Sequence, residues 1–387
     1  MIITVACDVL GEENNGTSIA SMNLIRYLKK QGHVVRVLCG DEKRKGEADY
    51  FVVPNLNLGK LLNAYVKKVG VTLAKPQKEI ISAALSGADA VHIMTPFLLG
   101  RATLEAAVKL NLPVTAGFHA QAENFSSYIK MQWCEPLNHF FYVNNWKHFF
   151  SKVDGIHYPT EFIKNLFEKE IGKKTNGYVI SNGVNDYVQK RTTEKPIEWR
   201  DKIVILSTGR YAREKSQDVL IKAVGYSKHK EEILLVLGGQ GVKEKKYRKL
   251  AKNLPVEPIF KFYSRKEIID VVNACDIYVH PAEVELEGIS CIEAIACGKL
   301  TIVSSSEKSA TRGYAVSDLC VFKNRDPEDL ARVIDYWIEN PTEKLKCEEQ
   351  YLLSSKAYDQ EKCMEKMEQM IKEVYNEKKN SSKDGVL

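Results

Sequence analysis

Two glutamates eight positions apart, Glu285 and Glu293, are the residues of this chain whose type and spacing most clearly suggest chemistry. Gly288 lies between them, and apolar residues recur at helical spacing from Ile289 onward. We therefore expect Glu285 in a loop and Glu293 inside a helix. Carboxylates accept hydrogen bonds from hydroxyl groups, and the free N–H groups of a helix start bind phosphate. This spacing could hold two sugars of one extended ligand, whereas the simpler interpretation is that the acids only stabilise the helix dipole.

The elements expected around these glutamates form a βαβ unit. Apolar runs predict buried strands at residues 276–280 and 300–304. Between them, helical spacing predicts a helix at residues 289–297, which stops at Gly298. Ligands of open α/β sheets bind at the loop that joins a strand to the next helix. We therefore expect a ligand beside Glu285.

Two cations follow another expected strand, at residues 203–207. Arg210 comes directly after Gly209, and Lys215 precedes a helix that we expect to begin at Ser216. Two fixed cations beside free N–H groups would neutralise a diphosphate, most strongly when the diphosphate leaves in a transition state. Solvated surface charge is the alternative interpretation of these residues.

Two segments of the first half could also contact a ligand. Gly16 follows the first expected strand and would allow close approach of the backbone, and Thr17 could cap the helix that starts there. His119 follows the strand expected at residues 113–116, where a histidine either contacts a ligand or simply closes a loop. His92 lies inside an expected strand, and we interpret it as a packed core residue.

Strands and helices alternate along the whole chain, which predicts an α/β protein with parallel, doubly wound sheets. In the first half we expect strands at residues 2–6, 34–39, 90–94, 113–116, 155–158 and 177–181, and helices at residues 17–30, at 100–110 and from 160. In the second half we expect strands at 203–207, 233–238, 258–261, 276–280 and 300–304, and helices at 216–226, 241–252, 264–274 and 289–297. The remaining segments are a polar linker at 184–200, an amphipathic helix at 356–379 and a disordered tail at 380–387.

Size and composition suit a globular protein of two domains, because 387 residues exceed one ordinary core, with 44% hydrophobic and 27% charged residues. No run of 18 apolar residues predicts a membrane-spanning helix, and the N-terminus lacks the basic region of a signal peptide. The nine cysteines are scattered and lie mostly in apolar runs, which indicates reduced thiols of a cytoplasmic protein. The sequence shows no metal-binding motif, so we predict no metal.

The net charge of +6 belongs mainly to residues 1–183, where 21 Lys and Arg face 16 Asp and Glu. This excess predicts an anionic partner, either lipid or nucleic acid. Residues 60–75 carry an apolar helical stripe flanked by lysines, which is typical of a helix that binds a lipid surface. An aromatic-rich segment from Trp133 to Phe150 also favours a membrane interface. The alternative is that both stripes face the core.

Residues 285–293 resemble the E-x7-E motif of the retaining glycosyltransferases of family 4, and residues 209–215 resemble the G-R-x-x-x-x-K signature of the same family. The resemblance runs from residue 1 to about residue 379. It implies the GT-B fold, with two facing Rossmann-like domains that have parallel sheets. Its parts would be an acceptor-side domain at residues 1–183, a linker at 184–200, a nucleotide-sugar-binding domain at 201–355, and a helix at 356–379 that returns to the first domain.

The resemblance also implies a reaction, the transfer of a hexose from a nucleoside diphosphate sugar to a hydroxyl with retention of the anomeric configuration. In that reaction Arg210 and Lys215 would stabilise the leaving diphosphate. Glu285 would hold the sugar, and Glu293 would bind the ribose. His119 would contact the donor sugar.

Further residues would complete the donor site implied by the resemblance. The N–H groups of Gly288, Ile289 and Ser290 would bind the sugar hydroxyls and the diphosphate. Gly16 and Thr17 correspond to a glycine-bearing loop that touches the diphosphate and sugar. Arg265 lies where family members hold the nucleotide base. The donor is a substrate, and no further cofactor is implied.

The acceptor implied by the resemblance is a lipid. Residues 118–124 and 283–288 are similar to the branch of family 4 that glucosylates diacylglycerol on the cytoplasmic leaflet, with UDP-glucose or UDP-galactose as the expected donor. This branch implies an anionic membrane surface as partner, no nucleic acid, and a peripheral location at the inner face of the cell membrane. Leu286 and Glu287 depart from the family pattern, which often has Phe or Pro after the first glutamate, so the donor sugar stays open.

Three alternatives remain at this stage. A family 4 enzyme could act on a soluble sugar or polysaccharide instead of a lipid. A nucleotide-sugar epimerase shares the GT-B fold but would need acid and base carboxylates at the sugar. A nucleic-acid-binding protein would explain the basic first half, but the chain has no aromatic-basic motif for this role.

Overall fold

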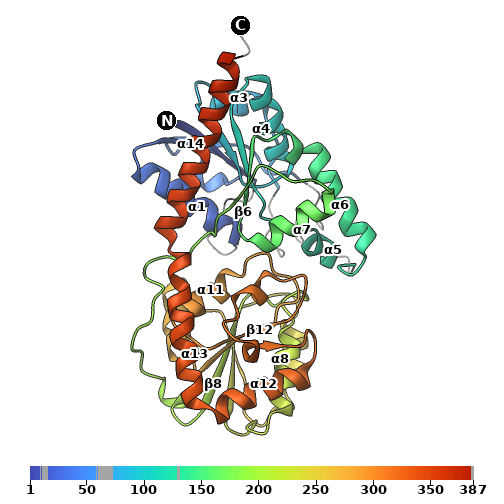
Figure 1. The fold of residues 1–387 in the computed structure, drawn as a ribbon, viewed down its shortest axis with the longest axis vertical. Helices are drawn as coiled ribbons and strands as arrows, with labels where there is room; N and C mark the ends of the chain where they lie inside the picture. The colour runs from blue at the N-terminus through green and yellow to red at the C-terminus, as the bar shows by residue number, and fades with distance from the viewer. Residues whose placement is uncertain (9, 11–15, 58, 60–72, 129–130, 385–387) are drawn as a thin grey trace. The chain divides into compact units, whose positions relative to one another are not determined.

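The computed structural model describes residues 1–384 except residues 9, 11–15, 58, 60–72 and 129–130 (Figure 1). The chain divides into two compact units. Unit 1 comprises Met1–Asn182 together with Glu361–Leu387, and unit 2 comprises Gly183–Gln360. Each unit has its own parallel sheet, covered by helices.

Unit 1 is built on a seven-stranded parallel sheet in the order β3-β2-β1-β4-β5-β6-β7. Its strands are β1 (Ile2–Cys7), β2 (Val34–Cys39), β3 (Tyr50–Val52), β4 (Ala90–Ile93), β5 (Val114–Gly117), β6 (Gly155–Tyr158) and β7 (Gly177–Val179). Its described helices are α1 (Gly16–Lys30), α3 (Lys78–Leu85), α4 (Leu98–Lys109), α5 (Ala122–Tyr128), α6 (Glu135–His148) and α7 (Glu161–Ile171), joined by α14 (Gln360–Asp384). Because helices cover both faces, the central strands β1, β4 and β5 are buried almost throughout.

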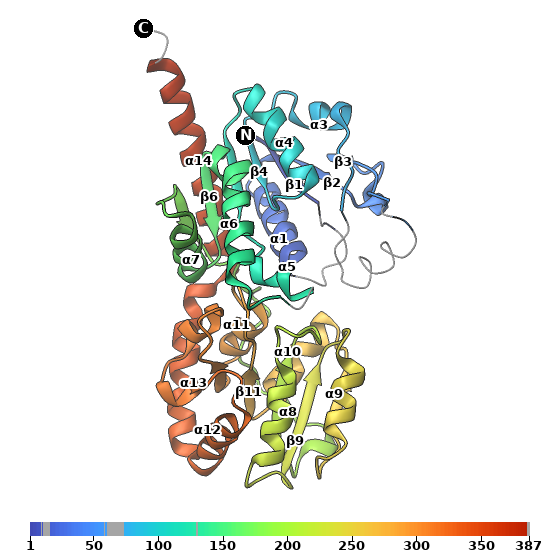
Figure 2. The same cartoon turned by 90° about the vertical axis from the view of Figure 1, so that its right-hand side faces the viewer.

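The C-terminal helix α14 packs on the sheet of unit 1, as expected for the returning helix. Its buried methionines share a core with Ile3 and Val5 of β1. Figure 2 shows α14 beside β6. Val374 lies against Gly155 of β6, and the Lys378 ammonium lies 2.7 Å from the Asp154 carboxylate next to the same strand. The helix continues to Asp384, so residues 380–384 are helical and not disordered as predicted.

Unit 2 is built on a six-stranded parallel sheet in the order β10-β9-β8-β11-β12-β13. Its strands are β8 (Ile203–Thr208), β9 (Ile233–Gly238), β10 (Ile259–Lys261), β11 (Ile277–His280), β12 (Thr301–Ser304) and β13 (Val321–Phe322). Its helices are α8 (Gln217–Tyr226), α9 (Glu244–Ala251), α10 (Arg265–Ala274), α11 (Ile289–Ala296), α12 (Pro327–Glu339) and α13 (Pro341–Ser354). The expected α/β class with doubly wound parallel sheets is therefore confirmed.

The predicted linker at residues 184–200 belongs to unit 2. The apolar side chains of Val184, Val188 and Trp199 are buried in the core of that unit. The Lys195 ammonium lies 2.5 Å from the carboxylate of Asp276. The sequence of this segment predicts a linker because its buried apolar residues are few and widely spaced among polar ones.

Asp8, at the end of β1, is a buried carboxylate. Its two oxygens accept hydrogen bonds from the backbone N–H groups of Leu99 and Gly100, each at 3.1 Å, at the start of α4. Burial raises the pKa of Asp8 to about 6, although these hydrogen bonds partly oppose the increase. The folded pKa therefore lies above the unfolded value. The contribution of Asp8 to stability is present at low pH and is lost as the pH rises through about 6.

An Asp8→Asn variant, which cannot titrate, tests this assignment. Relative to the parent protein, its free energy of unfolding should improve by about 1.4 kcal/mol between about pH 5 and about pH 8, because only the parent must ionise a buried acid. Urea denaturation at the two pH values measures the difference. A gap between the two proteins that does not change with pH would contradict the assignment.

Candidate active site

The residues predicted for the donor site in unit 2 gather at the carboxyl edge of its sheet. Parallel strands end at the same edge, so the loops after β8, β10 and β11 lie near one another. Strands β8 and β11 are direct neighbours, with Leu206 paired to Tyr278. This pairing brings the loop with Lys215 to the loop with Glu285, although 70 positions separate these residues.

Lys215 and Glu285 form a largely buried ion pair, with side chains that are 18% and 13% exposed. The Lys215 ammonium donates to Oε2 of Glu285, and the same oxygen lies 3.0 Å from Nε2 of His280. His280 ends β11 and stacks on the ring of Tyr278. The sequence predicted separate roles for the lysine and the glutamate, and the structure joins them into one charged cluster.

The charge state of this cluster follows from its contacts. Burial alone would raise the pKa of Glu285, but the Lys215 ammonium and the hydrogen bond from His280 outweigh burial and hold that pKa well below its usual value. Burial lowers the pKa of His280, and Glu285 only partly opposes this effect. Glu285 is therefore a carboxylate at neutral pH. Its contribution to stability is lost only when the pH falls through its low folded pKa.

Backbone contacts position the loop that carries Glu285. The N–H of Glu283 donates to the carbonyl of Glu214 at 2.8 Å, which fixes the residue next to Lys215. The Ser306 hydroxyl donates to the carbonyl of Glu283 at 2.6 Å. The N–H of Ala310 donates to the carbonyl of Glu285 at 2.8 Å. The segments after β8 and after β12 therefore hold the backbone around Glu285 in place.

Gly288 forms the N-cap of α11, three residues after Glu285. Its φ of +81° is left-handed, and a Cβ at this position would lie 2.7 Å from Cγ2 of Thr311. Glycine is therefore required here for two reasons. Among the described residues, the N–H groups of Gly288, Ile289 and Ser290 donate no backbone hydrogen bond, because the first N–H groups of a helix have no carbonyl partner within it. They are available for an anionic group.

Arg265 and Glu293 are partners in the structure. Nη1 of Arg265, at the start of α10, lies 2.7 Å from Oε1 of Glu293. Ser264 and Glu267 form a capping box that fixes this end of α10. Burial raises the pKa of Glu293, and Arg265 opposes the increase. Nothing in the sequence pattern indicated this pairing.

Arg210 lies at the rim of the site. Its guanidinium lies 3.3 Å from the carboxylate of Glu214, and its side chain is 47% exposed. Its backbone carbonyl accepts a hydrogen bond from Nε2 of Gln217 at 2.9 Å. Ser216, which caps α8, has a φ of +53°, a strained conformation that is common beside ligand sites. Arg210 and Lys215 both lie on the short loop between β8 and α8.

In unit 1, His119 follows β5 and folds back over Gly117. A Cβ at Gly117 would lie 2.4 Å from Nε2 of His119. Burial and the nearby His157 and His92 hold the pKa of His119 well below its usual value, so the ring is neutral. His92 is fully buried, as predicted for a core residue.

A Gly117→Ala variant tests whether this position of the His119 ring matters. The added methyl group must displace the ring, because 2.4 Å is shorter than any normal carbon–nitrogen contact. We expect donor-sugar turnover to fall by about tenfold, comparable to the loss of one hydrogen bond. Gly225→Ala is the matched control, since a Cβ there meets only Leu254 at 3.5 Å. Equal turnover of both variants would contradict the expectation.

The other predicted contacts of unit 1 lie at the start of α1. This helix begins at Gly16, so Thr17 lies in its first turn and does not precede the helix as a cap residue would. The carbonyl of Thr17 accepts a hydrogen bond from the Ser21 hydroxyl at 2.8 Å. The preceding residues 11–15 lie outside the described part of the chain.

The two predicted membrane segments have different outcomes. Most of the basic helix at residues 60–75 lies outside the described residues. In the aromatic segment, Tyr142, Phe149 and Phe150 are buried in unit 1, whereas Trp133 and Phe140 are 41% and 59% exposed. The core interpretation therefore holds for the first three residues and not for Trp133 and Phe140. Among the described helices, none is long and apolar enough to cross a membrane.

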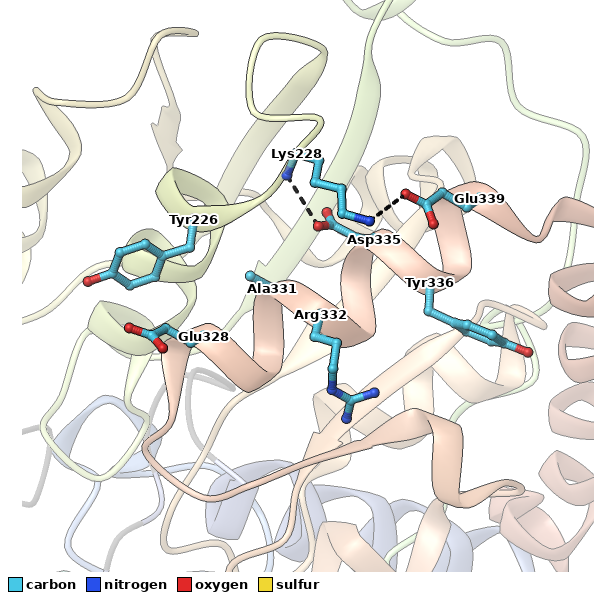
Figure 3. A pocket seen from close by; sticks show the side chains of 8 residues that line it. All are labelled: Tyr226, Lys228, Glu328, Ala331, Arg332, Asp335, Tyr336 and Glu339. Atoms are coloured by element: carbon cyan, nitrogen blue, oxygen red, sulfur yellow. Dashed lines mark hydrogen bonds and ion pairs between the residues drawn. The ribbon is translucent and has the colours of Figure 1, made fainter.

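A surface hollow of about 550 Å³ lies elsewhere on unit 2. Tyr226 at the end of α8 and the α12 residues Glu328, Asp335 and Tyr336 line it (Figure 3). Lys228 spans it, with its ammonium 3.2 Å from Glu339. The end of α8 lies at the opposite edge of the sheet from the carboxyl ends of the strands. The hollow includes none of the predicted site residues, so we do not assign it to the donor.

Sequence reasoning missed His280 and Glu283 as parts of the site. His280 ends a buried strand five residues before Glu285, and this position was the available signal. Glu283 is fully buried, and its Oε1 lies 3.3 Å from Nδ2 of Asn324. In the described part of the chain, no group of three or more His, Cys, Asp or Glu residues is arranged to hold a metal ion.

Comparison with known proteins identifies the family of the chain. The family model described as Glycosyltransferase Family 4 matches residues 14–187, and the model described as Glycosyl transferases group 1 matches residues 189–351. Alpha-monoglucosyldiacylglycerol synthase of Streptococcus pneumoniae is 24% identical over 316 residues, which cover 77% of this chain and 70% of the relative. The synthase of the same name from Acholeplasma laidlawii is 24% identical over 319 residues, which cover 75% and 76%.

A solved structure shows the same fold. Anabaena Alr3699/HepE in complex with UDP and glucose has a TM-score of 0.73 at 15% identity, and the match covers 96% of this chain and 100% of that chain. The two family models together extend from residue 14 to residue 351. The chain therefore belongs to the family 4 glycosyltransferases and has the GT-B fold.

Proposed function

We propose that this protein transfers a hexose from UDP-glucose or UDP-galactose to the hydroxyl of a membrane lipid such as diacylglycerol, with retention of the anomeric configuration. The largely buried Lys215–Glu285 pair beside the N–H groups at the start of α11 is the observation that carries the proposal. A diphosphate sugar needs a cation and N–H donors for its phosphates and an acceptor for its sugar hydroxyls. Lys215 supplies the cation, the start of α11 supplies the N–H donors, and Glu285 supplies the acceptor, all within unit 2.

The cluster suits the charges that develop during transfer. Breaking the bond between the anomeric carbon and the diphosphate oxygen leaves positive charge on the sugar ring and negative charge on the diphosphate. Lys215 and Arg210 would stabilise that negative charge, each by about 3 kcal/mol. The acceptor hydroxyl would attack from the face that the diphosphate leaves, and its proton would pass to a diphosphate oxygen. Front-face displacement of this kind needs no protein nucleophile.

The remaining predicted residues take binding roles in this proposal. Glu285 would hold the sugar hydroxyls and Glu293 the ribose, with Arg265 at the base. His119 of unit 1 would contact the donor sugar, and its neutral ring suits a hydrogen bond better than an ion pair. Gly16, Thr17, Ile289 and Ser290 would complete the contacts. Because Arg210 and Lys215 supply positive charge, the proposal includes no metal and no further cofactor.

A lipid acceptor is supported by the relatives and by one surface. The two curated relatives are named as synthases of a glucosyldiacylglycerol. Trp133 and Phe140 are exposed on unit 1, and aromatic side chains favour the membrane interface. The basic excess of residues 1–183 would attract anionic lipid. We therefore propose a peripheral protein of the cytoplasmic membrane face.

The test uses the full-length protein with vesicles that contain diacylglycerol and anionic phospholipid. A panel of UDP- and GDP-sugars is supplied, and mass spectrometry with proton NMR identifies the product and its anomeric configuration. We expect an α-linked glycolipid from an α-linked UDP-hexose. Transfer only to soluble sugars would favour the polysaccharide alternative, and epimerised donor without any transfer would favour the epimerase. Either result refutes the proposed acceptor.

A further inference from the structure

Three histidines lie together in unit 1, and the proposed reaction uses only His119. In the strand register, His92 of β4 pairs with Thr115, and His157 of β6 pairs with Gly117. Residues two apart on a strand point to the same face, so the side chains of His92 and His157 share one face of the sheet. The His119 ring reaches the same face, because its Nε2 occupies the space of a Cβ at Gly117.

The tautomer of His157 follows from its hydrogen bond. Its Nε2 lies 2.6 Å from the carbonyl oxygen of Ile180. A carbonyl oxygen can only accept a hydrogen bond, so Nε2 carries the proton of the neutral ring. The other nitrogen, Nδ1, is therefore a bare acceptor. It is buried and has no hydrogen-bond partner among the described residues.

His92 presents a second bare acceptor. Its Nδ1 lies 2.9 Å from Oγ1 of Thr115, and the Thr115 hydroxyl is directed at the carbonyl of Val91 at 3.4 Å. We assign the threonine hydroxyl proton to this carbonyl, so that Nδ1 of His92 is the donor of the pair. Nε2 of His92 is left as an acceptor. It too is buried without a partner among the residues that the structure describes.

His119 faces these acceptors. Its Nε2 is the third buried nitrogen of the group without a described partner, and its ring lies edge-on to His157 with 5.3 Å between the ring centroids. Burial lowers the pKa of His92 to about 3 and that of His157 to about 4, so both rings are neutral. Three acceptors together would leave every lone pair unsatisfied, which is costly in a buried place. A proton on Nε2 of His119 removes this cost.

We propose that His157 is a positioning residue that holds His119 in the tautomer with its proton on Nε2, through one bound water between Nε2 of His119 and Nδ1 of His157. Nδ1 of His119 is then always an acceptor, ready for a hydroxyl of the donor sugar. His157 is the partner because its ring is the one in edge contact with His119. The sugar contact rests on the proposed function, whereas the tautomer does not.

Two substitutions of His157 separate its two hydrogen bonds. In His157→Gln the amide N–H reaches the place of Nε2 and keeps the bond to the Ile180 carbonyl, but the acceptor toward His119 is lost. In His157→Asn the side-chain oxygen takes the place of Nδ1 and keeps that acceptor, but the bond to Ile180 is lost. His92→Asn is the control, since it keeps a donor for Thr115 and removes only the other acceptor.

The readout is the nitrogen-15 NMR spectrum of histidine-labelled full-length protein, with the His119 signals identified by their absence in His119→Asn. In the parent protein we expect one tautomer with the proton on Nε2. His157→Gln should show a mixture of tautomers, with kcat reduced about tenfold and the donor KM little changed. His157→Asn should keep both the tautomer and kcat but unfold at a lower temperature. His92→Asn should leave the His119 signals unchanged.

Several outcomes would overturn the proposal. A His119 ring that carries its proton on Nδ1 in the parent protein contradicts it. This measurement needs no variant, so the proposal can be decided even if His157→Gln does not fold. His119 signals that change in His92→Asn but not in His157→Gln assign the role to His92. The spectrum also reports on His119 in a protein that transfers no sugar, so failure of the proposed function is distinguished from failure of this inference.

Discussion

Replacing Lys215 by methionine should reduce kcat/KM for the donor sugar by about 10²–10³-fold, because a fixed cation at a leaving diphosphate acts mainly in the transition state. Glu285→Gln should cause a loss of similar size, since both side chains belong to one buried cluster. Steady-state kinetics with the donor identified by the sugar panel measure both changes. Lys246→Met is the matched control, because Lys246 pairs with Asp218 on the exposed surface of unit 2.

The same substitutions should affect stability in a way that separates folding from chemistry. Lys215→Met leaves the Glu285 carboxylate buried with only His280 as partner, which should lower the free energy of unfolding by about 3 kcal/mol. Combining Lys215→Met with Glu285→Gln removes both charges and should recover most of that stability without recovering activity. A Lys215→Met protein that transfers sugar at the parent rate would exclude Lys215 from the mechanism.

The second large effect is expected at Glu293. Glu293→Ala should raise the donor KM by about 10–100-fold, because a hydrogen bond to a charged group contributes about 1.5–3 kcal/mol to binding. kcat should change much less, since the ribose is remote from the bond that breaks. Isothermal titration with UDP, together with the kinetics, measures the loss of affinity. Glu244→Ala, which removes an exposed carboxylate paired with Arg248, should leave UDP affinity unchanged.

The partner of Glu293 makes this prediction sharper. Arg265 lies 2.7 Å from its carboxylate, so Glu293→Ala also removes this ion pair from a guanidinium beside the site. Arg265→Ala alone should weaken UDP binding less than Glu293→Ala, because the carboxylate remains for the ribose hydroxyls. If both variants bind UDP as tightly as the parent protein, the nucleotide is not held at this end of α11.

The sequence identified most of the elements that carry the site, and the reason is local. Apolar runs of four to six residues marked β8, β9, β11 and β12, and helical spacing marked α8, α10 and α11, mostly to within a residue or two. The strands β3 and β13 were not predicted, because three and two residues are too short for a pattern. Helices α12 and α13 were not predicted either, although Asp326 caps α12 in the usual way.

Partners within the site could not be predicted from spacing. Lys215 contacts Glu285 because β11 pairs with β8, although the two strands are far apart in the sequence. His157 meets His119 for the same kind of reason, since β6 adds beside β5. The burial of Val184, Val188 and Trp199 could not be predicted from residues 184–200 either, because other segments of unit 2 form the core that buries them.

The sequence by itself determined which residues carry the charges and hydroxyl acceptors, and on which strand–loop–helix units they lie, because local periodicity and turn chemistry act over a few residues. Tertiary structure decided which of these groups touch and which histidine nitrogen carries a proton. Strand order sets those contacts, and it is chosen by the packing of the whole sheet. The ionised state of Glu285 depends on a lysine 70 positions away.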